Sequence, residues 1–439
     1  MYNVLMLFGK KNVLILLFIL GLLIRLSIIF YDFAFDVNNH IIWAEDLWSR
    51  GFAGFYETRS SMMFGTAYPN YPPLVNFLFY LMYPVQKIVY SLFWWLNISI
   101  PAFPSKIIYL IESRTFQAAI FKLPAIFTDL ATAYLIYLYG KRLVPKNSQT
   151  TLTVVSLVLL NPAFFFNSAL WGQIDIIPIF FVMLSFYFGL FTKRNIASSL
   201  LFLFSILIKP TTLVFLPVYL VLYFQKYGLK KSIFALITAT IFFIASFMPF
   251  YKEGNLLLFP FKTYFTNILQ AQSLPFVTNG AFNFWGVITQ FKGIKDTSPF
   301  IFGISYRLWG GLIVGIIIFY IYYVLSKKKD KFLIPVYSSF LLAFASFLFL
   351  TKMHERYLML PLSFLLLTII KDRKYLKWFL LLSLLSFINL YHSWAVPKVG
   401  IIYSAIDSPL GLSVLSAVLF SLFLFFLIDY SKLKSSGRR

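Results

Sequence analysis

The chain has 439 residues, of which 60% are hydrophobic, and its mean hydropathy is +0.81. A soluble domain cannot bury that much apolar surface, and the continuous apolar runs of roughly 17–25 residues are each long enough to cross a bilayer. They indicate an all-α polytopic membrane protein and argue against a β-barrel, whose strands alternate in hydrophobicity. The net charge of +23 comes from Lys and Arg in short loops, so it does not indicate nucleic acid as a partner.

Apolar runs follow one another along the whole chain, which reads as one integral membrane domain, 1–439. No second domain or low-complexity linker interrupts them. We predict about twelve membrane-spanning helices of the usual length. They are expected at 12–30, 117–140, 151–168, 175–192, 196–208, 211–225, 232–250, 303–326, 332–350, 357–370, 376–391 and 409–429.

The segment 74–100 is apolar, but Pro84, Gln86 and Lys87 interrupt it. Because proline removes a helical hydrogen bond, we expect two halves of about 10–13 residues that lie at the membrane interface without crossing. With that arrangement the short loops rich in Lys and Arg all fall on one side, which the positive-inside rule assigns to the cytoplasm. Both termini are then cytoplasmic, and two long loops, 31–116 and 251–302, are extracytoplasmic.

Ionisable residues within or near the outer ends of the predicted spans are candidates for function, because burying them in a membrane is costly. All of those that stand out fall on the predicted extracytoplasmic side, which favours a shared site over scattered structural roles. They are Arg25, Asp32, Asp36, Lys122, Asp129, Asp175, Lys209, His354, Glu355 and Arg356.

Asp36 follows the first predicted span and precedes an amphipathic segment that contains Ile41, Ile42 and Trp43. We predict that Asp36 is a catalytic general base at the membrane surface, where the head of a lipid-linked substrate would lie. The alternative is that Asp36 is only the N-cap of that helix.

Two further polar sites are predicted at outer turns. Gln173 and Asp175 follow Gly172, which permits a tight turn, and we predict that both bind substrate; a plain polar hairpin is the alternative. Lys209 lies between two short spans, where it either meets an anionic substrate or extends its amine to the interface.

Three consecutive ionisable residues, His354, Glu355 and Arg356, follow another span at its outer end. The guanidinium of arginine matches phosphate oxygens, so we predict substrate binding here; a structural Glu355–Arg356 network is the alternative. His40 and His392 are expected to be interfacial residues and not ligands.

The chemistry follows from the absence of nucleotide-binding motifs in the sequence, which has neither G-x-G-x-x-G nor a Walker loop. A sugar on a polyprenyl phosphate fits an extracytoplasmic site, because phosphate is a good leaving group that needs no general acid. One carboxylate could then activate an acceptor hydroxyl for in-line attack with inversion, and Lys or Arg would stabilise the departing phosphate. A multi-span transporter or lipid flippase is the alternative function.

The chain resembles the GT-C superfamily of membrane glycosyltransferases, most closely prokaryotic mannosyltransferases related to the GPI-anchor enzymes. The motifs that carry the resemblance are FDVNNHIIWAEDL, YPNYPPL, KLPAIFTDL, NSALWGQID, LIKPTTLVFLP and KMHERYLMLP. The resemblance implies a GT-C-like fold with juxtamembrane helices in the first loop, and transfer of mannose or glucose from a polyprenyl-phosphate donor to a lipid, glycan or protein acceptor.

The resemblance also implies roles for individual residues. Asp36 matches the catalytic first-loop Asp, and the segments around Asp175, Lys209 and His354–Arg356 match donor-site motifs. Tyr71 is expected in the substrate site, although Asn70 stands where relatives often have Asp. The family suggests no cofactor or bound metal, although Asp32, Asp36 and Asp175 could hold a divalent ion.

Overall fold

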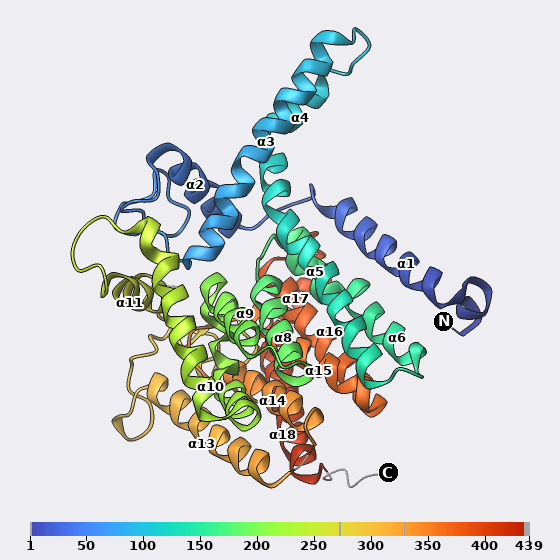
Figure 1. Cartoon of the computed structure of the whole chain (residues 1–439), viewed down its shortest axis with the longest axis vertical. Coiled ribbons are helices and arrows are strands. Elements are labelled where there is room, and N and C mark those ends of the chain that lie inside the picture. Colours follow the sequence, from blue (N-terminus) through green and yellow to red (C-terminus); the bar gives the residue numbers. More distant parts are fainter. Residues whose placement is uncertain (1, 272–273, 329, 434–439) are drawn as a thin grey trace.

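The computed structural model describes residues 2–271, 274–328 and 330–433, which are mostly helical. Figure 1 shows a helical bundle from which a hairpin of α3 and α4 projects. The elements in chain order are α1 Tyr2–Ile28, α2 Phe35–Arg50, α3 Pro73–Ser99, α4 Lys106–Glu112, α5 Arg114–Leu143, α6 Ser148–Leu159, α7 Pro162–Phe165, η1 Phe166–Trp171, α8 Ile176–Phe191, α9 Asn195–Ile208, η2 Pro210–Phe215, α10 Leu216–Phe247, η3 Met248–Phe250, α11 Phe259–Thr263, η4 Tyr264–Gln270, β1 Thr278–Asn279, α12 Phe284–Thr289, η5 Ile301–Gly303, α13 Tyr306–Lys327, α14 Leu333–Phe349, β2 Met353–His354, η6 Glu355–Leu358, α15 Met359–Lys371, η7 Arg373–Tyr375, α16 Leu376–Ser393, α17 Gly400–Asp407 and α18 Pro409–Lys432.

Helices occupy all of the intervals predicted as spans, which confirms an all-α, membrane-embedded protein. In the described ranges, six helical segments are both long and apolar enough to cross a membrane, and the count of about twelve stays a prediction. One of the six, Pro210–Phe250, includes the two predicted spans 211–225 and 232–250. The helix bends between them at Gly228, whose φ is +74°. The six are Gly9–Ile28, Arg114–Leu143, Ser148–Trp171, Pro210–Phe250, Tyr306–Lys327 and Pro409–Lys432.

Helices α14 and α15 form the centre of the bundle. All side chains of residues 334–349 and 359–370 are buried, so neither helix has a face for solvent or lipid. The peripheral helices α1, α10 and α13 instead expose large apolar residues, among them Ile19, Leu236 and Ile316. Such a surface is unfavourable in water but suits the hydrocarbon core of a bilayer.

Segment 74–100 is one continuous helix, α3, so the expectation that Pro84 divides it in two is wrong. Pro84 has no N–H to donate to the carbonyl of Tyr80, four residues earlier. The indole Nε1 of Trp48, on α2, donates to that carbonyl at 2.7 Å, and its ring stacks on Tyr80 with centroids 4.7 Å apart. A tertiary hydrogen bond thus replaces the missing helical one.

The two long predicted loops lie against each other at one end of the bundle. The side chain of Asn267 donates to the carbonyl of Tyr56 at 2.9 Å, and Asn70 donates to the carbonyl of Ala271 at 3.1 Å. Although they are far apart in sequence, the loops therefore share one side, as the sequence predicts.

A short parallel sheet joins the second loop to the segment after α14. Thr278 pairs with Met353, and Asn279 pairs with His354. The amide of Asn389, on α16, holds the following turn by donating to the carbonyl of Gly280 at 2.8 Å. The sheet therefore fixes the position of His354 and the residues that follow it.

Several of the predicted basic loops also contact one another. Arg373 donates to the hydroxyl of Thr150 at 2.9 Å, and Lys328 donates to the carbonyl of Ser431 at 2.7 Å. These contacts support a common side for these loops, whereas their assignment to the cytoplasm stays a prediction.

Candidate active site

Asp36 lies in the first turn of α2, with Ala34 at the N-cap position and no side chain capping the helix. The Asp36 carboxylate accepts a hydrogen bond from the side chain of Gln173 instead. The alternative interpretation of Asp36 as an N-cap is therefore wrong.

The segment that leads into α2 is held by backbone contacts. The backbone N–H of Ala34 donates to the carbonyl of Trp171 at 2.9 Å. The amine of Lys122, on α5, donates to the carbonyls of Ile29 and Asp32. Lys122 therefore orients the chain before Asp36 and does not itself line the cavity described below.

Gly172 lets the turn after η1 approach α2 closely. Its φ is +82°, in the left-handed region that favours glycine. A Cβ at this position would come within 2.7 Å of Cγ2 of Val37 and 3.2 Å of the Lys122 side chain. The turn thus needs glycine both for its backbone conformation and for its packing.

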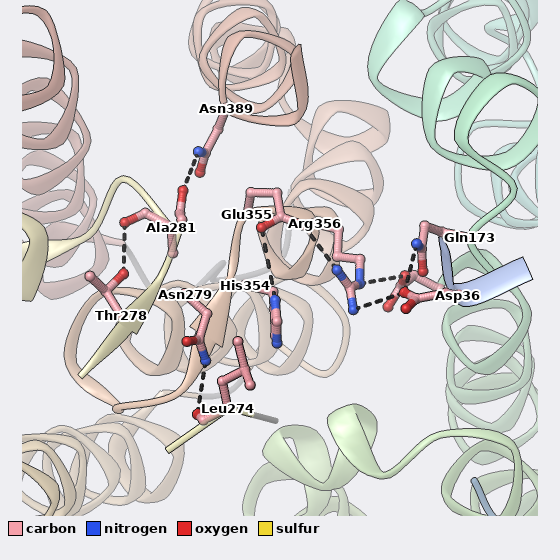
Figure 2. Close-up of polar contacts among 12 residues, drawn as sticks. Asp36, Gln173, Leu274, Thr278, Asn279, Ala281, His354, Glu355, Arg356 and Asn389 are labelled. Atoms are coloured by element: carbon pink, nitrogen blue, oxygen red, sulfur yellow. Dashed lines mark hydrogen bonds and ion pairs between the residues drawn. The ribbon is translucent and has the colours of Figure 1, made fainter. Parts of the chain in front are cut away.

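The two carboxylate oxygens of Asp36 have different surroundings. Oδ2 accepts a hydrogen bond from Nε2 of Gln173 at 2.9 Å and lies 3.4 Å from Nη2 of Arg356 (Figure 2). Oδ1 accepts no hydrogen bond from the described residues, and the side chain is 35% exposed. One oxygen is thus held in place while the other is open to a ligand.

Asp175 and Lys209 form a buried ion pair beside Asp36. Nζ of Lys209 lies 2.6 Å from Oδ1 of Asp175 and faces the rings of Tyr71 and Tyr357, at 5.8 and 5.6 Å from their centroids. Burial lowers the pKa of Lys209, and the neighbouring Asp175 opposes that shift.

Arg356 connects these groups to Glu355. Its Nη1 donates to Oε1 of Glu355 at 2.9 Å, and its Nε lies 3.6 Å from Oδ2 of Asp175 without forming a hydrogen bond. The structural network proposed as an alternative therefore exists, but the same guanidinium also reaches Asp36. The Nε–H group stays buried without an acceptor among the described residues, which suits binding of an anionic oxygen.

Asp36, Arg356 and His354 line a common cavity of about 490 Å³. This volume is within the usual range for small-molecule sites. The remaining walls come from α2, from the loop that precedes α3 and from the second long loop, which contributes Ala271, Leu274 and Pro275. Lining residues of α2 and of the loop that precedes α3 are Phe35, Asn39, His40, Trp43, Phe64, Gly65, Thr66, Asn70 and Tyr71.

Electrostatics keep Asp36 ionised. Burial would raise its pKa, but the charge of Arg356 and the hydrogen bond from Gln173 outweigh burial and hold the pKa at about 2. Burial, reinforced by Arg356, lowers the pKa of His354 well below its usual value, so this imidazole is neutral. Burial also raises the pKa of Glu355, and Arg356 opposes that change.

Gln173, Asp175, Lys209 and Glu355 are not among the lining residues, although they contact Asp36, Arg356 or each other. Other predicted residues lie further from the lining. Arg25 and Asp129 form a fully buried pair at 2.7 Å, and Ser168 donates to the same carboxylate. This pair joins α1, α5 and η1. Asp32 and Lys122 contribute to the backbone anchoring described above.

No group of three or more His, Asp or Glu residues in the described part of the chain could hold a metal ion. The carboxylates of Asp36 and Asp175 instead face the cations Arg356 and Lys209. This donor set does not fit a divalent ion, so the metal site considered from the sequence finds no support in the geometry.

His40 was expected at the membrane interface, but it is 1% exposed and lines the cavity. Its spacing of four residues from Asp36 puts both on one face of α2, and this was the available signal. His40 is buried because Tyr71 and Phe79 cover its ring, and its place relative to the membrane interface stays a prediction.

The sequence profile of glycosyltransferase family 87 matches residues 106–354, more than half of the chain. The chain belongs to glycosyltransferase family 87. The match includes Asp175, Lys209 and His354, whereas Asp36 precedes it. Family 87 membership favours a glycosyltransferase over the transporter or flippase considered from the sequence. No curated protein matches the chain.

Proposed function

We propose that this family 87 glycosyltransferase moves a hexose, mannose or glucose, from a polyprenyl-phosphate donor to an acceptor hydroxyl with inversion at the anomeric carbon. Asp36 is the general base, and Arg356 and Lys209 bind the donor phosphate. Asp175, Gln173, Glu355, His354 and Tyr71 bind or order the substrates.

The proposed step needs only one proton acceptor. Oδ1 of Asp36 takes the proton of the acceptor hydroxyl as its oxygen attacks the anomeric carbon. The bond between that carbon and the phosphate oxygen breaks, and the electron pair leaves with the polyprenyl phosphate. Arg356 and Lys209 stabilise the growing negative charge. No metal takes part.

An apolar groove supports a lipid-linked donor. It has a volume of about 370 Å³ and lies between η2, α10, α13 and α14. Its walls include Val214, Ile318 and Leu342, and it reaches Tyr357, whose ring centroid is 5.7 Å from Cζ of Arg356. A prenyl chain in this groove would bring its phosphate close to the two cations.

The topology of the site supports an extracytoplasmic reaction in a cell-membrane protein with both termini cytoplasmic. The cavity is built from residues of the two long loops that contact each other. The short basic loops, which the positive-inside rule assigns to the cytoplasm, form a separate set.

The observation that carries the proposal is the asymmetric Asp36 carboxylate, with Oδ2 held by Gln173 and Arg356 and Oδ1 open. We would test it with purified protein in lipid nanodiscs and a panel of polyprenyl-phosphate hexoses, with nucleotide sugars in parallel. We expect transfer from a lipid-phosphate hexose only, an inverted anomer by NMR and no effect of EDTA. Transfer from nucleotide sugars alone, or retention of configuration, would contradict the proposal.

A further inference from the structure

His40 lies one helical turn after Asp36 on α2, so its side chain points to the same side of the helix. Its ring stacks on Phe79, with centroids 4.3 Å apart, and lies 5.4 Å from the ring of Tyr71. The imidazole lines the cavity that Asp36 and Arg356 share, and only 1% of the residue is exposed.

Neither ring nitrogen of His40 has a hydrogen-bond partner in the part of the chain that the structure describes. Buried polar atoms are nearly always paired, so an unpaired imidazole in a cavity wall requires an explanation. Its neighbours on α2 are paired: Asn39 donates to the carbonyl of Phe64, and the indole of Trp43 donates to Ser60. On this face of the helix His40, like Oδ1 of Asp36, therefore has hydrogen-bonding capacity left for a ligand.

The protonation state of His40 limits what that ligand can be. Burial, opposed only in part by Asp36, lowers its pKa to about 3, so the ring is neutral at physiological pH. A neutral imidazole offers one N–H donor and one nitrogen acceptor. A hydroxyl group can accept from the N–H or donate to the other nitrogen, whereas an anion could use the N–H alone.

We propose that His40 binds a hydroxyl of a substrate sugar in the cavity, beside the group that Asp36 deprotonates. This inference rests on the proposed function, and it adds a substrate-binding residue to the site. The sugar is either the acceptor or the transferred hexose, since both carry hydroxyls, and the experiment separates the two.

The test compares three variants of the full-length enzyme in nanodiscs. His40→Phe keeps an aromatic ring against Phe79 and removes both nitrogens, whereas His40→Asn restores one donor and one acceptor. His392→Phe is the matched control, because His392 is paired with Asp407 at 2.9 Å and is not part of the cavity lining. Initial rates are measured while the acceptor and the donor are varied in turn, and the melting temperature is measured without substrate.

We expect His40→Phe to lower kcat/KM about tenfold, the usual effect of one lost neutral hydrogen bond, with partial recovery in His40→Asn. A rise in KM for the acceptor alone would assign the hydroxyl to the acceptor, and a rise for the donor alone would assign it to the hexose. The unliganded His40→Phe protein should melt at a higher temperature than the wild type, because it no longer buries unpaired nitrogens.

A His40→Phe enzyme with wild-type kcat/KM for both substrates would overturn the inference, as would one that loses activity and heat stability together. The proposed function is tested separately, by the activity of the wild-type protein. If wild-type protein transfers a hexose, that function stands whatever the His40 variants do. If wild-type protein is inactive with every lipid-phosphate donor, both proposals fail.

Discussion

Nη2 of Arg356 lies 3.4 Å from Oδ2 of Asp36, so the cation proposed to bind phosphate also touches the proposed base. In the free enzyme this contact holds the pKa of Asp36 at about 2, against the opposing effect of burial. A donor phosphate that draws the guanidinium away would make Asp36 a stronger base. In the proposed mechanism, we therefore expect the base to become effective when the donor is bound.

Replacing Asp36 with Asn should lower the transfer rate by at least about 100-fold, because the amide cannot accept the acceptor proton. The amide keeps the shape of the carboxylate, so the melting temperature should change little. Initial rates of polyprenyl phosphate release would check this. Glu45→Gln, on the same helix but not part of the cavity lining, is the control and should retain wild-type activity. An active Asp36→Asn enzyme would remove Asp36 from the mechanism.

Replacing Arg356 with Gln should change the pH dependence as well as the rate. Without the guanidinium, less opposes the effect of burial, so the pKa of Asp36 should rise from its wild-type value of about 2. Since the base must be ionised, activity is lost as pH falls through this pKa. The acid limb of log kcat/KM should therefore move to higher pH than in the wild type, whose profile should stay flat down to about pH 4.

At pH values above the acid limb, kcat/KM of Arg356→Gln should also fall, on the order of 100-fold, because the variant lacks a side chain that binds the donor phosphate. Arg356→Lys keeps the positive charge and is the control, with an acid limb close to that of the wild type. Coincident limbs for the wild type and Arg356→Gln would show that Arg356 does not set the pKa of Asp36.

Replacing Gly172 with Ala should reduce both stability and activity. Alanine is strained at a φ of +82°, and its Cβ would meet Val37 at 2.7 Å and push on the start of α2. The expected cost is roughly 1–3 kcal/mol, read as a lower melting temperature together with slower transfer. Gly311→Ala, in α13, is the control, because a Cβ there meets nothing within 4 Å. Equal melting temperatures for the two variants would contradict the argument.

The sequence predicted much of the site because topology constrains it. Asp36, Asp175, Lys209 and Arg356 come from segments far apart along the chain, but each was expected at the same membrane side. The predicted alternation of spans places them at one end, and the structure joins them there through ion pairs. This argument depends on hydrophobic runs, which are the clearest signal in the sequence.

The properties that the sequence did not predict depend on contacts across elements. His40 is buried because Phe79, on α3, stacks on it, and no local pattern around His40 contains that information. Arg25 and Asp129 pair within the bundle, 104 positions apart, and not at the cavity. The continuity of α3 likewise depends on a residue of α2.

Whether Trp48 of α2 keeps α3 continuous at Pro84 can be tested with a double-mutant cycle at these two positions. In the wild type, Trp48 donates to the carbonyl of Tyr80 that Pro84 leaves without a helical donor. Trp48→Phe should keep the ring stacking and lose this hydrogen bond, which should cost about 1 kcal/mol. In a Pro84→Ala background, the backbone N–H of residue 84 can serve the same carbonyl, so Trp48→Phe should cost clearly less. The free energy of unfolding of all four proteins gives the coupling between the two positions. Additive effects would mean that the indole does not compensate for the proline, and that another contact keeps α3 continuous.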